Sequence, residues 1–397
     1  MKTLEIINII IMLGLTVYSL YFVVTALFLF KKKKETEVLS EKQNHFTILI
    51  PARNEENVIK DVIESFNKQK YPKDKYEVIV VINNTLDNTE SVSKSSGASI
   101  LLCERRIKNK GDALKEAFDK LNNKETDAYI IMDADNIVNE EFLSEMNKSI
   151  NKGALVAKSN MDIKAKQNTW VSSSYAIYFF IQSILFSKPR NNIGVSSAIN
   201  GTGIMIKKEV IDKYGFNVKT ITEDLEFMTL CALNNIKITY VENAICYAEH
   251  PSNFKVSMLQ RRRWTKGIYE GFILYINKLA KHLIKYHTIE SLDCLLIYST
   301  PIILIAGIIS FIINLLIVPL PLFIKITIPS LIISYISISL CALFVCIKNK
   351  KNTKEFLSGI LMFPIFLLTW QYLNIIILFK KEITWDEIKH SEKIENI

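Results

Sequence analysis

The sequence lacks any pair of cysteines at the spacing of a zinc or redox motif. Its six cysteines are scattered, and none belongs to a CxxC pair. Cys103, Cys231 and Cys246 fall in the segment that we expect to be cytoplasmic, where thiols stay reduced. The pattern therefore indicates neither a disulfide framework nor a cysteine zinc site. An internal repeat and a low-complexity linker are also missing.

Charge is missing from four long stretches of the chain, although hydrophobic residues make up 49% of the whole. The uncharged stretches are 6–30, 294–324, 326–347 and 356–379. Each is long enough to cross the hydrocarbon core of a bilayer as a helix. The chain between about residues 31 and 293 is polar and mixed, as in a globular domain. The sequence therefore predicts a multi-pass membrane protein with one large water-exposed domain.

The first apolar run reads as an anchor, not as a cleaved signal peptide. It is too long for a signal peptide, and its basic cluster, Lys31–Lys34, follows it. By the positive-inside rule this cluster places the large domain in the cytoplasm, on the inner face of the plasma membrane. Lys348, Lys350, Lys351 and Lys354 mark a second cytoplasmic loop.

The net charge of +9 is explained by these juxtamembrane lysines, which attract anionic membrane lipids. Nucleic acid is not an expected partner, because the basic residues cluster at the membrane edges.

Apolar strands alternate with amphipathic helices in the water-exposed part. The expected strands are 46–50, 77–82, 99–102 and 128–132, and the expected helices are 55–69 and 110–121. This alternation predicts an α/β domain with a mostly parallel sheet covered by helices on both faces. Ligands of such sheets bind beyond the carboxyl ends of the strands, which is where the polar candidates follow.

Asp133 and Asp135 follow the fourth expected strand, one residue apart. Such a pair can hold a divalent cation against a diphosphate, although aspartates after a strand also occur in plain surface turns. Four further segments are PARNEE at 51–56, KGDAL at 110–114, TEDLE at 222–226 and QRRRW at 260–264. In this order the segments resemble the inverting, processive glycosyltransferases of family 2. The resemblance covers roughly residues 46–270 and implies a GT-A-like fold inserted between transmembrane helices.

The resemblance implies that Asp224 is the catalytic base, which takes the proton of the acceptor hydroxyl as it attacks the anomeric carbon. The alternative is a plain helix start, in which Thr222 is the N-cap and Glu226 serves a capping role. Both can hold at once, because a base at a helix start is held rigidly.

A nucleotide-sugar site is implied on the donor side, with UDP as the leaving group. The residues assigned to it by resemblance are Ala52, Asn54, Glu55, Asn83, Asp87, Lys110 and Asp133. Asp135 is the implied ligand of Mg²⁺ or Mn²⁺, which would stabilise the charge developing on the diphosphate. Asn83 stands where the family often has an acid against uracil, so the identity of the nucleotide is less secure. Lys110 could instead be a solvated lysine at a helix start.

An acceptor site is implied by the remaining motif residues, which are Gly201, Thr202, Glu223, Gln260, Arg263 and Trp264. Trp264 offers an apolar face to a sugar ring, and Arg263 can engage the diphosphate in a bidentate way. The alternatives are an interfacial Arg/Trp cluster and, for the loop Asn200–Gly203, a plain turn.

The expected domains are an anchor at 1–31, the catalytic domain at 44–264, amphipathic interfacial helices at 265–293, two transmembrane helices at 294–347, a third C-terminal segment at 356–379 and a polar tail at 380–397. The amphipathic stretch suits a helix in the membrane interface, the alternative being an ordinary surface helix. Pro364, Gln371 and Asn374 favour a partly interfacial or re-entrant third segment. The tail, with Trp385, could then fold back towards the active site.

The leading hypothesis is a processive β-glycosyltransferase, a family 2 inverting hexosyltransferase that polymerises a sugar from UDP-N-acetylglucosamine or UDP-glucose and couples polymerisation to secretion. The alternative is a transferase that adds one sugar to a membrane lipid. A catalytically dead scaffold is disfavoured by the intact Asp133, Asp135, Asp224 and Gln260. Because the spans are few, a secretion channel could require a homo-oligomer.

Overall fold

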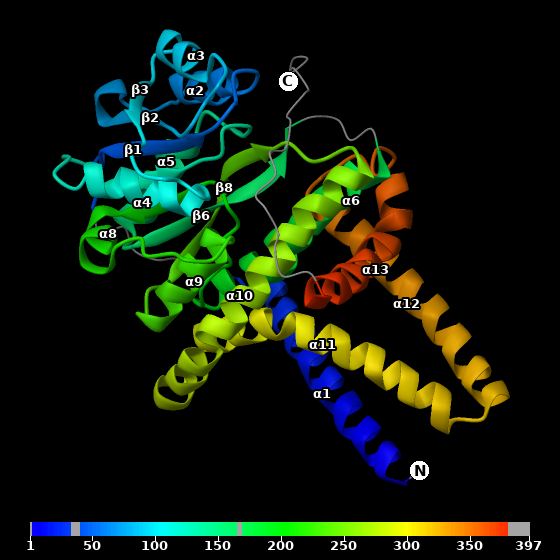
Figure 1. Cartoon of the computed structure of the whole chain (residues 1–397). Coiled ribbons are helices and arrows are strands. Elements are labelled where there is room, and N and C mark those ends of the chain that lie inside the picture. Colours follow the sequence, from blue (N-terminus) through cyan, green and yellow to red (C-terminus); the bar gives the residue numbers. More distant parts are fainter. Residues whose placement is uncertain (1, 33–39, 165–168, 380–397) are drawn as a thin grey trace.

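The computed structural model describes residues 2–32, 40–164 and 169–379. The predicted fold-back of the polar tail, with Trp385, lies outside these residues, as do Lys33 and Lys34 of the first basic cluster. The remainder forms one α/β domain joined to long helices, with the first helix at the amino-terminal end and three at the carboxyl-terminal end (Figure 1).

An eight-stranded sheet forms the centre of the α/β domain, in the order β3-β2-β1-β4-β7-β6-β8-β5. The strands are β1 (Phe46–Ala52), β2 (Tyr76–Ile82), β3 (Ser99–Leu102), β4 (Ala128–Ile131), β5 (Ile137–Val138), β6 (Val156–Ile163), β7 (Ile204–Lys207) and β8 (Ile238–Ala248). Strands β1 to β4 are parallel to one another, whereas β7 is antiparallel to both β4 and β6. Strands β6 and β8 pair in parallel and β5 is antiparallel to β8, so the sheet is mostly parallel, as predicted.

Helices cover both faces of this sheet, which confirms the predicted layers. In the α/β domain the helices are α2 (Ile59–Asn67), α3 (Thr89–Ser95), α4 (Lys110–Lys120), α5 (Phe142–Asn151), α8 (Lys208–Tyr214) and α9 (Glu223–Leu233), with the 3₁₀ turn η2 (Lys73–Lys75). Alternate residues of β1 separate the two layers: Ile48 packs towards α2 and α5, and Leu49 towards α4 and α9. Both side chains are fully buried, as expected for strands covered on both faces.

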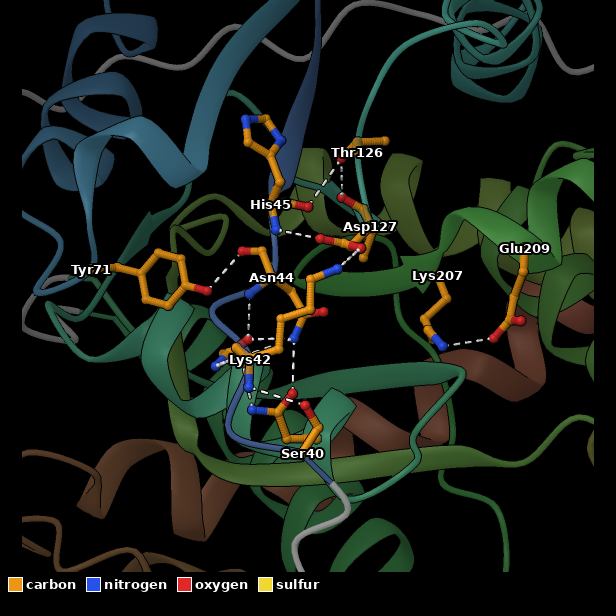
Figure 2. Close-up of polar contacts among 12 residues, drawn as sticks. Ser40, Lys42, Asn44, His45, Tyr71, Thr126, Asp127, Lys207 and Glu209 are labelled. Atoms are coloured by element: carbon orange, nitrogen blue, oxygen red, sulfur yellow. Dashed lines mark hydrogen bonds and ion pairs between the residues drawn. The ribbon is translucent and has the colours of Figure 1, made fainter.

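Polar contacts fix the chain just before β1, at the edge of the sheet where the parallel strands begin (Figure 2). Lys42 forms an ion pair with Asp127, and the backbone N–H of His45 donates to the same carboxylate at 2.8 Å. The hydroxyl of Tyr71 donates to the carbonyl of Asn44 at 2.7 Å. These contacts attach the segment that follows the first long helix to the base of the sheet.

Within the residues that the structure describes, four helices are long and apolar enough to cross a membrane, which indicates a membrane protein with an attached α/β domain. They are α1 (Lys2–Leu27) with its 3₁₀ extension η1 (Phe28–Phe30), α11 (Ile289–Ile317), α12 (Leu320–Lys348) and α13 (Leu357–Phe379). Helices α1 and α11 pack side by side, while α13 packs against α12 and α6 (Trp170–Ile181) (Figure 1). Helix α13 is continuous through Pro364, and whether it crosses the membrane or lies in the interface stays a prediction.

Helix α10 (Phe254–Tyr286) connects the QRRRW segment to the long apolar helices at the carboxyl-terminal end. It runs without interruption through the expected boundary between residues 264 and 265, because no proline or left-handed residue occurs before His287, which caps it at φ 54°. The QRRRW segment and the amphipathic stretch therefore belong to one element. Its inner face packs on α9 and α11 through Tyr275 and Leu279.

Candidate active site

A cavity of about 410 Å³ opens where β1 and β4 end. Its walls come from the loops after β1, β2 and β4, from the loop before β7, and from helices α6, α9 and α10. This is the position that parallel sheets give to ligand sites, and the structure places most of the motif residues around it. The predicted residues that line it are Ala52, Glu55, Asn83, Lys110, Asp133, Asp135, Gly201, Thr202, Glu223, Asp224, Gln260, Arg263 and Trp264.

Lys110 connects the donor-side and acceptor-side motifs. Its ammonium lies 2.5 Å from Asp133, 3.5 Å from Glu223 and 2.6 Å from the carbonyl oxygen of Gly201. Burial alone would lower the pKa of Lys110, but these two carboxylates raise it above its ordinary value. Lys110 is therefore a permanent positive charge within the cavity wall, which does not fit a solvated helix-start lysine.

Glu223 and Asp224 share the start of α9 but differ in their surroundings. Burial raises the pKa of Glu223 to about 7, an effect that the nearby Lys110 partly offsets. Asp224 accepts hydrogen bonds from the backbone N–H of Gly201 at 2.7 Å and of Leu225 at 2.8 Å. Because the two backbone donors bind different oxygens of the carboxylate, they fix its orientation. Asp224 is thus held in one orientation at the wall of the cavity.

The expected capping arrangement at α9 forms only in part. Thr222 is the N-cap residue, but its side chain accepts no capping hydrogen bond. Glu226 instead accepts from the backbone N–H groups of Lys219 and Thr220, each at 2.6 Å, and from the hydroxyl of Tyr275. The start of α9 is therefore fixed by Glu226 and not by the Thr222 side chain.

The loop Asn200–Gly203 forms part of the cavity wall and is held in place by buried contacts. Gly201 and Gly203 have φ values of +38° and +65°, which favour glycine. A side chain at Gly203 would meet the Ser159 hydroxyl at 2.0 Å. Thr202 accepts at its hydroxyl from the Asp133 N–H at 3.0 Å and at its carbonyl from the buried ammonium of Lys158 at 2.6 Å. These contacts do not fit a plain surface turn.

An aromatic wall forms part of the cavity lining, made of side chains from α6 and α10 together with His250. Trp264 packs with Tyr178 at a ring distance of 6.3 Å and an interplanar angle of 21°, and edge-on with Tyr175 at 5.9 Å. His250 stacks on Phe179 at 5.2 Å. Flat apolar rings of this kind suit the faces of a sugar ring.

The three arginines of the QRRRW segment have separate positions. Arg263 lines the cavity, whereas Arg261 is fully buried on another side of α10. Arg261 donates to the carbonyl of Phe366 at 3.1 Å and to the hydroxyl of Thr369 at 2.6 Å, both on α13. The motif therefore contributes one cation to the cavity and uses another to attach α13 to α10.

Two predicted donor-side residues do not line the cavity. Asn54, at φ 57°, accepts the N–H of Leu86 at 2.8 Å. Asp87 accepts the N–H of Glu56 and of Thr89, each at 3.0 Å, and so holds the loop after β1 against the start of α3. Both side chains face the neighbouring loops, and their role in nucleotide binding stays a prediction.

Few protein side chains are placed to bind a metal ion at this site. Among the described residues no group of three or more histidine, cysteine, aspartate or glutamate side chains is arranged to hold an ion. Asp135 and His250 both line the cavity, and His250 Nε2 is buried without a hydrogen-bond partner. Burial lowers the pKa of His250 to about 4, so its imidazole stays neutral, as a metal ligand must be. The residues fit an ion that takes its remaining ligands from a diphosphate.

Sequence analysis missed several residues of the cavity because they belong to no motif. They are Tyr175, Tyr178, Phe179, Gln182 and His250. Three belong to α6, whose mixed apolar sequence resembles any core helix. A histidine directly before Pro251 gave no signal of its own.

Comparison with known proteins gives a consistent family assignment. The sequence model described as Glycosyltransferase like family 2 matches residues 43–267. The β-monoglucosyldiacylglycerol synthase of Nostoc sp. is 23% identical over 59% of this chain and 51% of its own length. The poly-β-1,6-N-acetyl-D-glucosamine synthase of Staphylococcus epidermidis is 22% identical over 69% of this chain and 70% of its own length. The chain spans about half the length of the first curated relatives that it matches.

A solved structure shares the fold along almost the whole chain. The mannosyltransferase PcManGT of Pyrobaculum calidifontis, solved with GDP-Man and Mn²⁺, aligns with a TM-score of 0.63 at 16% identity. The alignment covers 96% of this chain and 100% of that one, so the similarity includes the long helices. At this identity the likeness establishes the GT-A-like fold.

Proposed function

The chain belongs to glycosyltransferase like family 2, and from this premise we propose that it polymerises a sugar from a UDP-sugar, UDP-N-acetylglucosamine or UDP-glucose, into a β-linked polysaccharide at the cytoplasmic face of the plasma membrane. One observation carries the proposal: Asp224, Asp133 and Trp264 line the same cavity. A base, a donor-side carboxylate and an acceptor platform are the three parts that inverting sugar transfer requires.

In the proposed reaction, a hydroxyl of the acceptor attacks the anomeric carbon from the side opposite the nucleotide. Asp224 takes the proton of that hydroxyl. Two backbone N–H groups fix the orientation of its carboxylate for this step. The bond between the anomeric carbon and the diphosphate breaks with inversion. Arg263 and Lys110, which both line the cavity, balance the negative charge that develops on the leaving diphosphate.

A divalent ion, Mg²⁺ or Mn²⁺, would add Lewis-acid stabilisation of the diphosphate. We propose that Asp135 and His250 hold it, since both line the cavity and His250 has a neutral imidazole with an unpartnered nitrogen. Asp133, which is paired with Lys110, is left for the nucleotide sugar.

Polymerisation is supported by Trp264 and Tyr178, which offer the acceptor end a stacked aromatic surface beside the base. It is also the activity in the name of the Staphylococcus epidermidis relative, which this chain matches over 70% of that protein's length.

Transfer of one sugar to a membrane lipid is the second candidate. One observation favours it: the cavity reaches Ile268 of α10 and Ile297 of α11, so part of its wall is apolar and belongs to a membrane-spanning helix. The Nostoc relative is named for a glucosylated diacylglycerol.

Incubation of the purified full chain with UDP-N-acetylglucosamine or UDP-glucose, in Mg²⁺ or Mn²⁺, separates the candidates. A polymer that grows with time supports the proposed function, and a lipid-linked monosaccharide supports the second candidate. Absence of UDP release with every donor would contradict both, provided that the protein remains folded.

A further inference from the structure

Gln182 lies where helix α6 changes into a wider π-helical turn, η3 (Gln182–Ser187), before α7 (Lys188–Asn192). Short π-helical segments inside α-helices occur frequently at functional sites, because they displace a side chain from the regular helical row. Gln182 is the first residue of this turn and lines the cavity. No sequence motif includes it.

Both ends of the Gln182 amide are engaged, and one of them fixes Asn200. The Gln182 amide nitrogen donates to the hydroxyl of Tyr178 at 2.9 Å. Its carbonyl oxygen accepts from the amide nitrogen of Asn200 at 3.1 Å. The next residue along the chain, Gly201, donates its N–H to the base, Asp224. Gln182 therefore joins the aromatic wall to the loop that holds the base.

This arrangement leaves two amide oxygens as open acceptors in the same cavity. Asn200 Oδ1 and Gln260 Oε1 are both buried, and neither has a hydrogen-bond partner within the described part of the chain. An amide oxygen can only accept, so a ligand must bring O–H or N–H donors to satisfy it. A buried acceptor that stays unsatisfied is unfavourable, and a ligand with matching donors would remove that cost.

We propose that Gln182 orients Asn200 to recognise a second hydroxyl of the acceptor, so that the acceptor is a saccharide and not a lipid alcohol. The proposal rests on the proposed function of the site. The hydroxyl that reacts is engaged by Asp224, so a diacylglycerol, which has a single hydroxyl, has none left for Asn200 or Gln260. A sugar ring offers several hydroxyls around its edge and a flat face for Trp264.

The test uses the purified full chain in lipid nanodiscs, with the UDP-sugar that supports turnover. The acceptors are β-linked trisaccharides of glucose and of N-acetylglucosamine, compared with 1,2-dioleoylglycerol. The variants are Gln182→Met, which keeps the length of the side chain without its polar atoms, and Gln182→Glu. The carboxylate of the second variant can accept from both the Tyr178 hydroxyl and the Asn200 amide, so it is the matched conservative control.

We expect the wild type to use a trisaccharide with a higher kcat/KM than dioleoylglycerol. Gln182→Met raises the KM for the saccharide about tenfold, while the KM for the donor stays within twofold, and Gln182→Glu restores most of the loss. A tenfold change corresponds to about 1.4 kcal/mol, the size of one such hydrogen bond. A purely structural role of Gln182 would change both KM values together.

Two results would overturn this inference while leaving the proposed transferase intact. They are a preference of the wild type for dioleoylglycerol, and an unchanged saccharide KM in Gln182→Met. Failure of the wild type to transfer sugar to either acceptor would instead contradict the proposed function itself, and the assignment of Gln182 with it.

Discussion

Loss of one side of the buried ion pair between Arg190 and Asp293 should destabilise the junction between the α/β domain and the membrane-spanning helices. Arg190 on α7 binds Asp293 on α11 through two parallel hydrogen bonds of 2.7 Å each, and both side chains are at most 2% exposed. Tyr21 on α1 adds a third hydrogen bond to Asp293 at 2.7 Å. Three separate elements thus meet at a single carboxylate.

The Arg190→Met variant removes two of these three hydrogen bonds to Asp293 and leaves a buried carboxylate without its counter-charge. Breaking a buried pair in this way typically costs about 3–5 kcal/mol, in line with the loss of two charge-assisted hydrogen bonds. The double variant Arg190→Met/Asp293→Leu removes both charges and should recover at least about 2 kcal/mol of that loss, because no unpaired charge remains.

Denaturant unfolding of the purified chain in detergent micelles measures both effects. Lys42→Met is the matched control, since it breaks an ion pair with Asp127 in which the lysine is 58% exposed, and it should cost no more than about 1 kcal/mol. The reasoning fails if Arg190→Met costs no more than this control, or if the double variant is less stable than the single one.

Three further results are expected. Glu223→Gln should stabilise the chain by about 1–3 kcal/mol at pH 8, because burial raises the pKa of Glu223 from its ordinary 4.5 to about 7 in the folded state. Between these two pH values the folded wild type keeps a proton that the unfolded chain loses, so its stability falls as the pH rises, whereas that of the variant does not. A series of unfolding measurements from pH 4 to 8 checks this difference. Gly203→Ala should lower the rate of sugar transfer at least tenfold and destabilise the folded chain by about 2 kcal/mol or more. The control is Gly194→Ala, at φ +79° with the nearest atom 3.8 Å from the added Cβ, which should lose only the backbone cost of about 1 kcal/mol. Equal losses of stability in thermal unfolding would contradict the steric argument. His250→Ala should weaken Mn²⁺ binding in the presence of UDP about tenfold or more, measured by calorimetry, and an unchanged affinity would remove His250 as a ligand.

The first half of the α/β domain could be predicted from the sequence because its strands are short, continuous apolar runs. β3 agrees with the prediction at both ends, and β2 and β4 differ from it by one residue at one end. β1 continues two residues further, through Pro51. The second half gave no such signal, because β6 includes the buried Lys158 and Ser159 and so resembles a polar segment.

The site could be predicted where its residues share a motif, since spacing carries the information. Asn54 and Asp87 are donor-side residues by resemblance; their side chains accept backbone N–H groups of the neighbouring loops, and a role in nucleotide binding stays a prediction. Gln182 and His250 could not be found, because their meaning depends on contacts between segments that are distant in sequence. Single polar residues become informative only when the fold brings them to one cavity.

The most direct test of the central claim is the turnover of Asp224→Asn. The substitution keeps the size of the side chain and an oxygen that can accept from Gly201, but it removes the ability to take a proton. The account predicts that sugar transfer from the active UDP-sugar falls at least about a thousandfold while the affinity for UDP stays within threefold. Transfer within tenfold of the wild type would contradict the assignment of Asp224 as the base.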